Sequence, residues 1–363
     1  MPPEPVADAR LVPFAVLLRA PLVLAQGRIA ERRGWLLRLV DGAGHVGWGE
    51  CAPFPGLSPE TLPEAEASLR AWMAAPLPEQ TEAALTPSAR AAVVGARLDL
   101  AAQAAGVSMA RALDGSAAAV VDIAALLAGD DAAVVAKARV AAHAGVRAAK
   151  LKVGAASVAD DARRVRAVAG ALAAASENGV ALRLDANRAW SYDDACRFAD
   201  AVAGVAIAYV EEPLADVGDG GSRLAAWTRA TGLPVALDES VAEIGTPDAL
   251  AGHSYAAAVV LKPLVVGGVG VALDWGRAAR RLGMAAVVSG AFETGVGTRH
   301  TLALAAALGA LGASAAGLDP YTFLATDVLT PRLPLDAASV DVEAALGPGH
   351  RVTMEGTGRG DGA

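Results

Sequence analysis

From about residue 120 onward, short apolar segments alternate with longer alanine-rich stretches at a regular interval. Most of these segments are continuously hydrophobic, which is typical of parallel strands covered on both faces. We therefore expect six to eight βα units over about 200 residues, which favours a TIM-like barrel of the α/β class over a doubly wound sheet. The expected strands are Val121–Leu126, Ala148–Val153, Ala181–Asp185, Ala208–Glu212, Val235–Asp238, Ala257–Lys262, Ala285–Ser289 and a segment near Ala316–Leu318.

The chain before this alternation has the pattern of a mixed α+β unit. Three short strands are expected, followed by two helices that begin near Pro59 and Ser88. The expected strands are Phe14–Leu18, Gly34–Val40 and His45–Cys51. We expect a capping domain over 1–105, a barrel over 106–329 and a tail over 330–363 that packs back on the cap.

The composition excludes several classes of protein. Hydrophobic residues make up 54% of the 363 residues and charged residues 19%, which is far from a disordered composition. The net charge is -8 and basic residues form no patch along the chain, so nucleic acid is not an expected partner. The uncharged run Thr301–Leu318 is mostly alanine and glycine, which favours a buried helix over a membrane span. Cys51 and Cys196 lie far apart, which suits a reducing cytoplasm.

Lysine is rare in this chain. Only four of the 31 cationic residues are lysines, at positions 137, 150, 152 and 262. Arginine cannot lose its proton in a protein, so a retained lysine can indicate a need for a neutral amine. Lys137 lies in an alanine-rich helical stretch, but the other three lie at the ends of expected strands.

Charged residues end successive apolar strands. In a barrel the carboxyl ends of all strands meet at one face, where such enzymes keep their active sites. Asp185, Glu211 and Asp238 would repel one another there unless a cation lay between them, and three hard oxygen ligands favour Mg²⁺. Lys152 and Lys262 would approach a bound substrate from other strands. Neighbouring cations would lower the pKa of such a lysine and make it a base near neutrality.

This order of strand ends resembles the enolase superfamily, in its muconate-lactonizing branch. The resemblance covers nearly the whole chain and implies an α+β cap, a (β/α)₇β barrel and a returning tail. It implies that Asp185, Glu211 and Asp238 bind Mg²⁺. In the pairs Glu211-Glu212 and Asp238-Glu239, the family pattern favours the first acid as the ligand. It also implies that Lys152 is the base and that Lys262 lies on the opposite face of the substrate.

Within that branch, three segments resemble the o-succinylbenzoate synthase family: 183–190, 289–297 and the cap segment 49–56. The resemblance implies a magnesium-dependent syn dehydration in menaquinone biosynthesis, acting on 2-succinyl-6-hydroxy-2,4-cyclohexadiene-1-carboxylate. Some members have a run of serines where this chain has Ser-Gly-Ala after the seventh barrel strand. The residues that would bind this small carboxylate substrate are Lys150, Arg183, Asn187, Ser289, Gly290 and Ala291.

Other functions remain open at this point. The same scaffold carries N-succinylamino acid racemases, dipeptide epimerases and muconate cycloisomerases. A racemase would need proton transfer by both Lys152 and Lys262, whereas a dehydratase needs only one base. A non-catalytic metal-binding barrel is a remote alternative, since a structural site needs no Lys-x-Lys pair. The sequence leaves open whether the protein is a monomer or a homo-oligomer.

Overall fold

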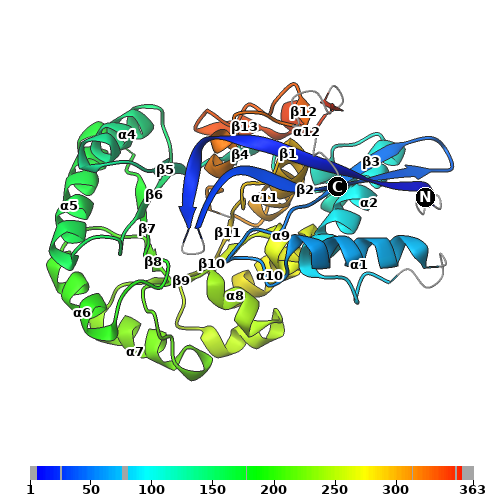
Figure 1. The fold of residues 1–363 in the computed structure, drawn as a ribbon. Coiled ribbons are helices and arrows are strands. Elements are labelled where there is room, and N and C mark those ends of the chain that lie inside the picture. The colour runs from blue at the N-terminus through cyan, green and yellow to red at the C-terminus, as the bar shows by residue number, and fades with distance from the viewer. Residues whose placement is uncertain are drawn as a thin grey trace.

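The computed structural model describes residues 6–24, 27–75, 81–176, 178–312, 314–347 and 350–353. Figure 1 shows a barrel of parallel strands with helices on its outer side, and an antiparallel sheet with two helices beside it. This is the α/β architecture expected from the sequence, with an N-terminal α+β cap.

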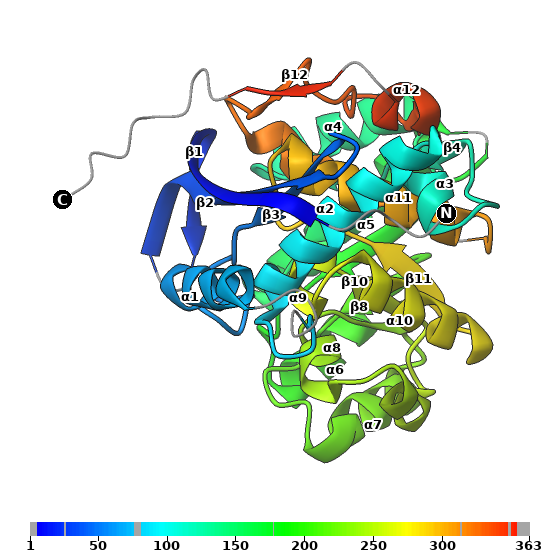
Figure 2. The same cartoon turned by 90° about the vertical axis from the view of Figure 1, so that its right-hand side faces the viewer.

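The cap sheet is an antiparallel meander of β1 (Val6–Leu24), β2 (Gly27–Asp41) and β3 (Val46–Cys51). Successive side chains of β2 point to opposite faces, so Leu37 packs in the cap core with α1 and α2, whereas Leu36 joins the larger core shared with the barrel. Helices α1 (Leu62–Ala74) and α2 (Pro87–Ala105) cover one face of the sheet (Figure 2). Helix α2 approaches β3 so closely that a Cβ on Gly49 would lie 1.8 Å from the carbonyl oxygen of Ala92.

Helix α1 begins later than the sequence predicted. Thr61 is its N-cap, and the Glu64 carboxylate accepts a hydrogen bond from the backbone N–H of Thr61 at 2.8 Å. This reciprocal capping fixes the helix start after Thr61. The proline in the first turn is therefore Pro63, and the expectation that Pro59 would be the first helical residue was wrong.

The barrel sheet has seven parallel strands in the order β11-β10-β9-β8-β7-β6-β5. Their bounds are β5 Ala125–Leu127, β6 Ala148–Lys152, β7 Ala181–Asp185, β8 Tyr209–Glu211, β9 Val235–Leu237, β10 Ala258–Leu261 and β11 Ala285–Val288. Parallel bridges from Ala316 to Ile123 and from Gly317 to Ser289 join the two edges of this sheet. The chain near Ala316 thus takes the place of the eighth strand, and the expected (β/α)₇β barrel is confirmed.

Helices connect the barrel strands and lie outside them, as Figure 1 shows most clearly for α4 to α7. Their bounds are α4 Asp131–His143, α5 Val158–Ala175, α6 Tyr192–Ala201, α7 Ser222–Thr231, α8 Glu239–Ile244, α9 Pro263–Val266, α10 Val269–Arg281 and α11 Gly295–Gly309. Helix α11 is almost entirely buried, so the uncharged run from Thr301 begins in a buried helix. Among the described residues, no helix is long and apolar enough to cross a membrane.

The predicted first strand, Val121–Leu126, is divided in the structure. Strand β4 (Val120–Asp122) pairs antiparallel with β13 (Ser339–Asp341), and only the next strand, β5, enters the barrel. The division follows from hydrogen bonding, because the N–H of Ile123 donates to Ala338 and the N–H of Ala124 donates to Ala316. The backbone thus changes its hydrogen-bond partner between Ile123 and Ala124, from the tail to the closing segment of the barrel.

The chain after the barrel forms short elements. These are β12 (Leu329–Thr330), which pairs with β14 (Arg351–Val352), then β13 and α12 (Val342–Leu346). Glu343 of α12 accepts hydrogen bonds from Ser108 and Arg111, the latter in the short helix α3 (Met109–Leu113). The tail thereby contacts the segment that joins cap and barrel.

Glu50, at the end of β3, links the cap to the barrel. Its buried carboxylate accepts hydrogen bonds from the backbone N–H and hydroxyl of Thr294 and from the N–H of Gly297. These donors belong to the N-terminus of α11, whose unpaired N–H groups favour an acidic partner. The cap thus supplies the carboxylate that caps a barrel helix.

Replacing Glu50 with alanine should lower the free energy of unfolding by about 3 kcal/mol, because it leaves three buried donors without an acceptor. The matched control is Asp8→Ala, since Asp8 is a cap carboxylate whose contacts with Arg10 and Arg38 lie at the surface. That change should cost less than about 0.5 kcal/mol. Denaturant titration of both variants measures the difference, and equal losses would contradict a special role for Glu50.

Candidate active site

The carboxyl ends of the barrel strands bring the predicted acids together. Lys152 is paired in register with Asp185, and Asp185 with Glu211. Asp238 follows directly after β9, the next strand in the sheet. All three acids are buried. Three carboxylates on neighbouring strands are thus held at one end of the barrel, as the strand spacing predicted.

Lys150 lies between two of these acids. Its Nζ is 2.9 Å from Oδ2 of Asp185 and also donates to Oε2 of Glu211. Burial alone would lower the pKa of Lys150, but Glu211 and Asp185 outweigh this effect and raise the pKa well above its usual value. The opposite balance holds for Glu211, since burial raises its pKa to about 7 despite the attraction of Lys150. The charges of this buried group are therefore strongly interdependent.

Lys262 forms an ion pair with the third acid, Asp238. Its Nζ donates to both oxygens of Asp238, each at 2.5 Å. Burial lowers the pKa of Lys262, but the Asp238 charge outweighs burial and raises it. Lys262 therefore lies in the site as a charged ammonium group.

Lys152 has the most accessible amine of the three. Its side chain is 61% exposed, against 22% for Lys150 and 13% for Lys262. Its Nζ donates to Oδ1 of Asn187 at 2.9 Å and lies 4.0 Å from Oδ2 of Asp185. The predicted base is thus placed at the opening of the site, beside the predicted substrate-binding residue Asn187.

The acid that follows Glu211 is used differently. Glu212 is completely buried, and its carboxylate accepts from the backbone N–H groups of Asp238 and Ser240, each at 2.9 Å. It also accepts from the Ser240 hydroxyl and from Nε of Arg188. With these four contacts, Glu212 ties the ends of three strands together and has little capacity left for a metal ion.

Backbone strain is concentrated around this face of the barrel. Among non-glycine residues in the described ranges, only four have positive φ: Asn187, Arg188, Glu212 and Phe292, between 39° and 62°. All four follow barrel strands at their carboxyl ends. Strained backbone of this kind persists where surrounding contacts hold it, often at functional sites.

The structure gives Arg183 other partners than the predicted substrate. Its buried guanidinium donates to the carbonyl oxygen of Ala315 at 2.8 Å and lies over the ring of Tyr209. Tyr209 belongs to a small apolar cluster inside the barrel, with Ala236 and Val260. The side chain of Arg183 therefore extends into the barrel interior, while Lys150 and Lys152 join the acids.

The predicted substrate-binding segment Ser289–Ala291 lies at the end of β11, next to the point where the barrel closes. Gly290 donates its N–H to the carbonyl oxygen of Gly317, and the Ser289 hydroxyl lies 3.4 Å from the same oxygen. Ala291 is buried and donates its N–H to Oε2 of Glu293. The sequence analysis gave no role to Glu293 or Arg188, although both lie within the segments 289–297 and 183–190 that carry the family resemblance.

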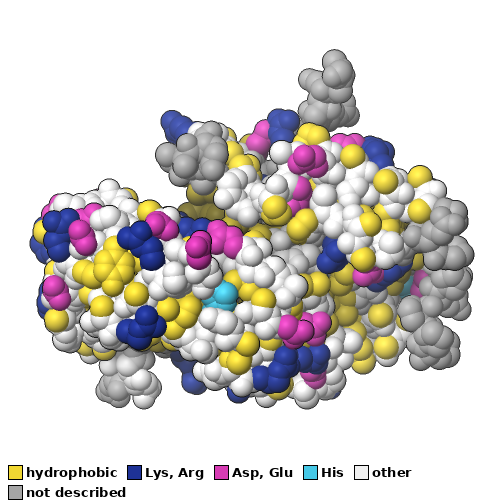
Figure 3. Space-filling model, turned by 90° about the horizontal axis from the view of Figure 1, so that it is seen from below, with side chains coloured by type: hydrophobic (Ala, Val, Ile, Leu, Met, Phe, Trp, Pro, Cys, Tyr) yellow, Lys and Arg dark blue, Asp and Glu magenta, His cyan; other side chains and the backbone are white. Residues whose placement is uncertain are grey.

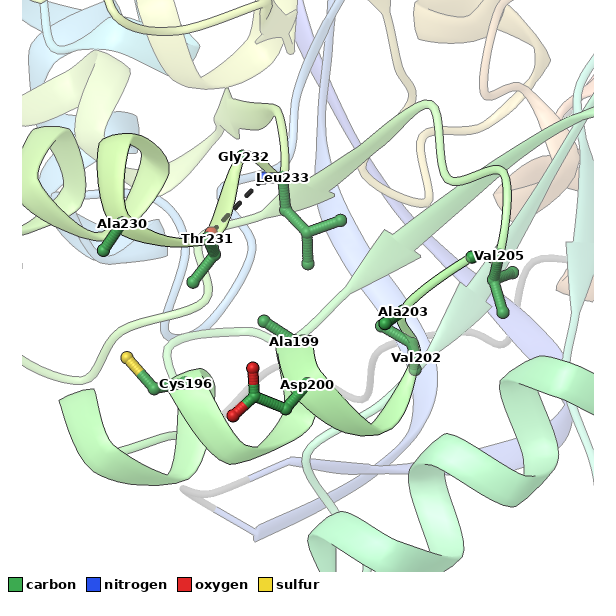
Figure 4. Close-up of a pocket in the computed structure, with 11 residues that line it drawn as sticks. Cys196, Ala199, Asp200, Val202, Ala203, Val205, Ala230, Thr231, Gly232 and Leu233 are labelled. Atoms are coloured by element: carbon green, nitrogen blue, oxygen red, sulfur yellow. Dashed lines mark hydrogen bonds between the residues drawn. The ribbon is translucent and has the colours of Figure 1, made fainter.

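A cavity of about 260 Å³ opens beside Asp238 and Lys262 and is bordered by Gly56 and Leu57 of the cap. Another cavity, of about 370 Å³, lies between α6 and α7, where Cys196 and Asp200 face the segment 230–233 (Figure 4). That segment precedes β9, so the second cavity lies at the amino ends of the strands, away from the acids. On the face shown in Figure 3, acidic and basic side chains are interspersed.

The acids fit a magnesium ion by their chemistry and position. They are hard oxygen donors from three adjacent strands, and each already accepts from a cationic ammonium group. Within the described ranges, no three His, Cys, Asp or Glu side chains are arranged as a metal cluster. In the metal-free chain, Lys150 and Lys262 hold these carboxylates in ion pairs.

Comparison with known proteins identifies the family. Residues 133–356 match the family described as enolase C-terminal domain-like, and residues 6–100 match the MenC N-terminal domain. The o-succinylbenzoate synthase of Citrobacter koseri is 33% identical over 302 residues, which cover 82% of this chain and 87% of the relative. The chain belongs to the o-succinylbenzoate synthase family of the enolase superfamily. The synthase of Salmonella arizonae is also 33% identical, over 89% of this chain and 94% of the relative.

Solved structures of this superfamily share the fold. The muconate lactonizing enzyme of Pseudomonas fluorescens has a TM-score of 0.81 at 21% identity, over 97% of this chain and 98% of that chain. A dipeptide epimerase of Enterococcus faecalis, solved with Mg and a dipeptide, has a TM-score of 0.80 at 24% identity, over 93% and 96%. Enzymes of this superfamily generally use Mg²⁺. Membership of the o-succinylbenzoate synthase family makes the chain a lyase and confirms the resemblance seen in the sequence.

Proposed function

We propose that this enzyme dehydrates 2-succinyl-6-hydroxy-2,4-cyclohexadiene-1-carboxylate to o-succinylbenzoate, in menaquinone biosynthesis. The observation that carries the proposal is the exposed amine of Lys152 beside three buried carboxylates, in a chain about a third identical to such synthases over most of its length. The substrate is a small carboxylate, and we place the reaction in the cytoplasm. We propose three parts for the chain: a capping domain over 1–105, a barrel over 106–329 and a tail over 330–363.

Asp185, Glu211 and Asp238 would hold Mg²⁺ on the side of the site where Lys150 and Lys262 now pair with them. When bound, the ion supplies Lewis acidity toward the substrate carboxylate. Lys150, buried beside Asp185 and Glu211, would contribute positive charge to the same carboxylate. Asn187 would orient Lys152, and Ser289, Gly290 and Ala291 would receive the succinyl arm.

The proposed reaction needs one base. The neutral amine of Lys152 takes the proton from the ring carbon that carries the carboxylate, and the electron pair moves into the carboxylate as an enediolate. The ammonium group of Lys262 faces this developing charge and stabilises it. Lys152 then returns the same proton to the departing hydroxyl, which leaves as water on the same face. The ring loses one molecule of water and becomes aromatic.

Arg183 is not retained as a direct substrate ligand in this proposal. Its hydrogen bond to Ala315 and its contact with Tyr209 support a role beneath the site. There it would keep β7 in place against the closing segment of the barrel.

A spectrophotometric dehydration assay with the cyclohexadiene precursor tests the proposal. We expect fast turnover that requires Mg²⁺ and stops with a chelator. If no turnover occurs but N-succinylamino acids or dipeptides exchange their α-protons in heavy water, the proposed substrate is wrong and a sister racemase or epimerase activity takes its place. If neither signal appears, the lyase assignment fails.

A further inference from the structure

Every backbone N–H of the predicted arm-binding segment already has an acceptor. Ser289 donates to the carbonyl oxygen of Leu261, and Gly290 to that of Gly317, each at 2.9 Å. These two bonds belong to the barrel itself. The third, from Ala291 to Oε2 of Glu293 at 2.5 Å, is made by a side chain. The conformation of the segment therefore depends on one buried carboxyl group.

Glu293 is fixed in a tight space. It is 3% exposed, and its Oε1 has no hydrogen-bond partner within the described part of the chain. A Cβ on Gly290 would lie 3.1 Å from Oε2, and one on Gly297 would lie 2.7 Å from the Cβ of Glu293. The side chain thus fills the space between the arm-binding segment and the first turn of α11.

Among the described residues, no cation forms an ion pair with this carboxyl group. The charged groups near it are Arg32 of β2, Glu50 of β3 and Lys262 after β10. The Arg32 guanidinium donates hydrogen bonds to the carbonyl oxygens of Ala52, Pro53 and Phe292, and in the described ranges it forms no ion pair. Lys262 is bound to Asp238.

These surroundings favour the uncharged form of Glu293. A buried carboxylate without a paired cation is costly. Burial raises the pKa of Glu293 and outweighs the opposing effects of the backbone N–H groups of Glu293 and Ala291 and of the charges on Arg32 and Lys262. Burial also raises the pKa of Glu50, to about 7, although three donors at the N-terminus of α11 oppose the effect. A charge on Glu293 would therefore add repulsion to a second buried carboxyl group. An uncharged Glu293 would also not repel an acidic ligand.

We propose that Glu293 is a positioning residue for the acidic arm of the substrate. It accepts the Ala291 N–H as a neutral acid and so fixes the conformation of Ser289–Ala291, which binds the arm. The inference rests on the proposed function for the presence of that arm. It predicts that glutamine, which keeps the accepting oxygen without the charge, can replace Glu293.

The experiment compares Glu293→Gln with Glu293→Ala in the magnesium-loaded enzyme. We expect glutamine to leave KM and kcat within about twofold of wild type. Alanine should raise KM about tenfold, the effect of one lost hydrogen bond of about 1.4 kcal/mol, and change kcat by less than about threefold. Calorimetry should show the same tenfold loss in Kd for o-succinylbenzoate and no loss for 2-acetylbenzoate, which lacks the acidic arm.

The outcomes that overturn the inference are distinct. If glutamine impairs binding as much as alanine does, the negative charge matters and the neutral-acid role is wrong. If alanine weakens 2-acetylbenzoate equally, Glu293 only supports the fold. Should Glu293→Ala not fold, Glu293→Asp serves instead, because its acid is too short to reach Ala291 and it should reproduce the tenfold loss.

Failure of the proposed function would be seen separately. If wild-type enzyme neither dehydrates the precursor nor binds o-succinylbenzoate, the proposed substrate is wrong whatever the variants do. The Glu293 variants would then be compared on an N-succinylamino acid and on its N-acetyl counterpart. A loss confined to the succinyl ligand in the alanine variant would support the positioning role, and equal losses would overturn it.

Discussion

Replacing Lys152 with alanine is expected to lower kcat for the dehydration by about a thousandfold or more, because a positioned general base contributes about 10²–10⁴-fold and the proposed mechanism gives this lysine both proton transfers. The amine is exposed at the mouth of the site and contacts Asn187, so its removal leaves no buried group unpaired. The free energy of unfolding should therefore change by less than about 0.5 kcal/mol.

The chain contains a matched control for this variant. Lys137 of α4 is the one lysine outside the site, and its exposed amine donates to the carbonyl oxygen of Ala128. Lys137→Ala should retain wild-type turnover in the same assay. A Lys152→Ala enzyme that folds and dehydrates at a near-normal rate would eliminate Lys152 as the base. A loss of turnover accompanied by a lower melting temperature would point to a structural role instead.

The sequence was sufficient to predict the barrel and the position of the site. Parallel strands buried on both faces give continuous apolar runs, and a charged residue at the end of such a run is conspicuous. The steps between Lys152, Asp185 and Glu211 match one βα unit, so the geometry of a barrel brings them to one face. The structure places these residues in register on neighbouring strands.

Other features depend on contacts between distant parts of the chain and were not predictable. The division of the first expected strand depends on β13, which lies more than two hundred residues later in the sequence. The direction of Arg183 depends on the carbonyl group of Ala315. Strand alternation alone placed Arg183 on the same side as Asp185, but it could not tell whether a long side chain extends toward the acids or into the barrel.

The roles of the adjacent acids Glu211 and Glu212 can be distinguished only from the contacts that each makes in the folded chain. The sequence offered two adjacent candidates for one metal ligand. The structure engages Glu212 with Arg188, Ser240 and the backbone of Asp238, while in the described ranges the Glu211 carboxylate accepts a hydrogen bond from Lys150 alone. This difference supports the proposal that Glu211 binds the metal and Glu212 holds the strand ends that carry the ligands.

The variants Glu211→Gln and Glu212→Gln are expected to separate metal binding from stability. Removing the Glu211 charge should weaken Mg²⁺ binding at least about a hundredfold, since a carboxylate ligand is lost. Burial raises the pKa of Glu211 to about 7, so its ionisation above that pH destabilises the metal-free fold. At pH 8 the metal-free Glu211→Gln protein should therefore be at least as stable as wild type.

Glu212→Gln should have the opposite effect. The new amide group would place a donor against Nε of Arg188 and the Ser240 hydroxyl, and Arg188 would keep only Glu243 as an ion-pair partner among the described residues. We expect a loss of about 3 kcal/mol in the free energy of unfolding, with a smaller effect on Mg²⁺ affinity, about tenfold. Calorimetric Mg²⁺ titration and denaturant unfolding of both variants measure the two quantities. If Glu212→Gln proves to be the variant that loses Mg²⁺ binding while keeping its stability, the roles of the two acids must be exchanged.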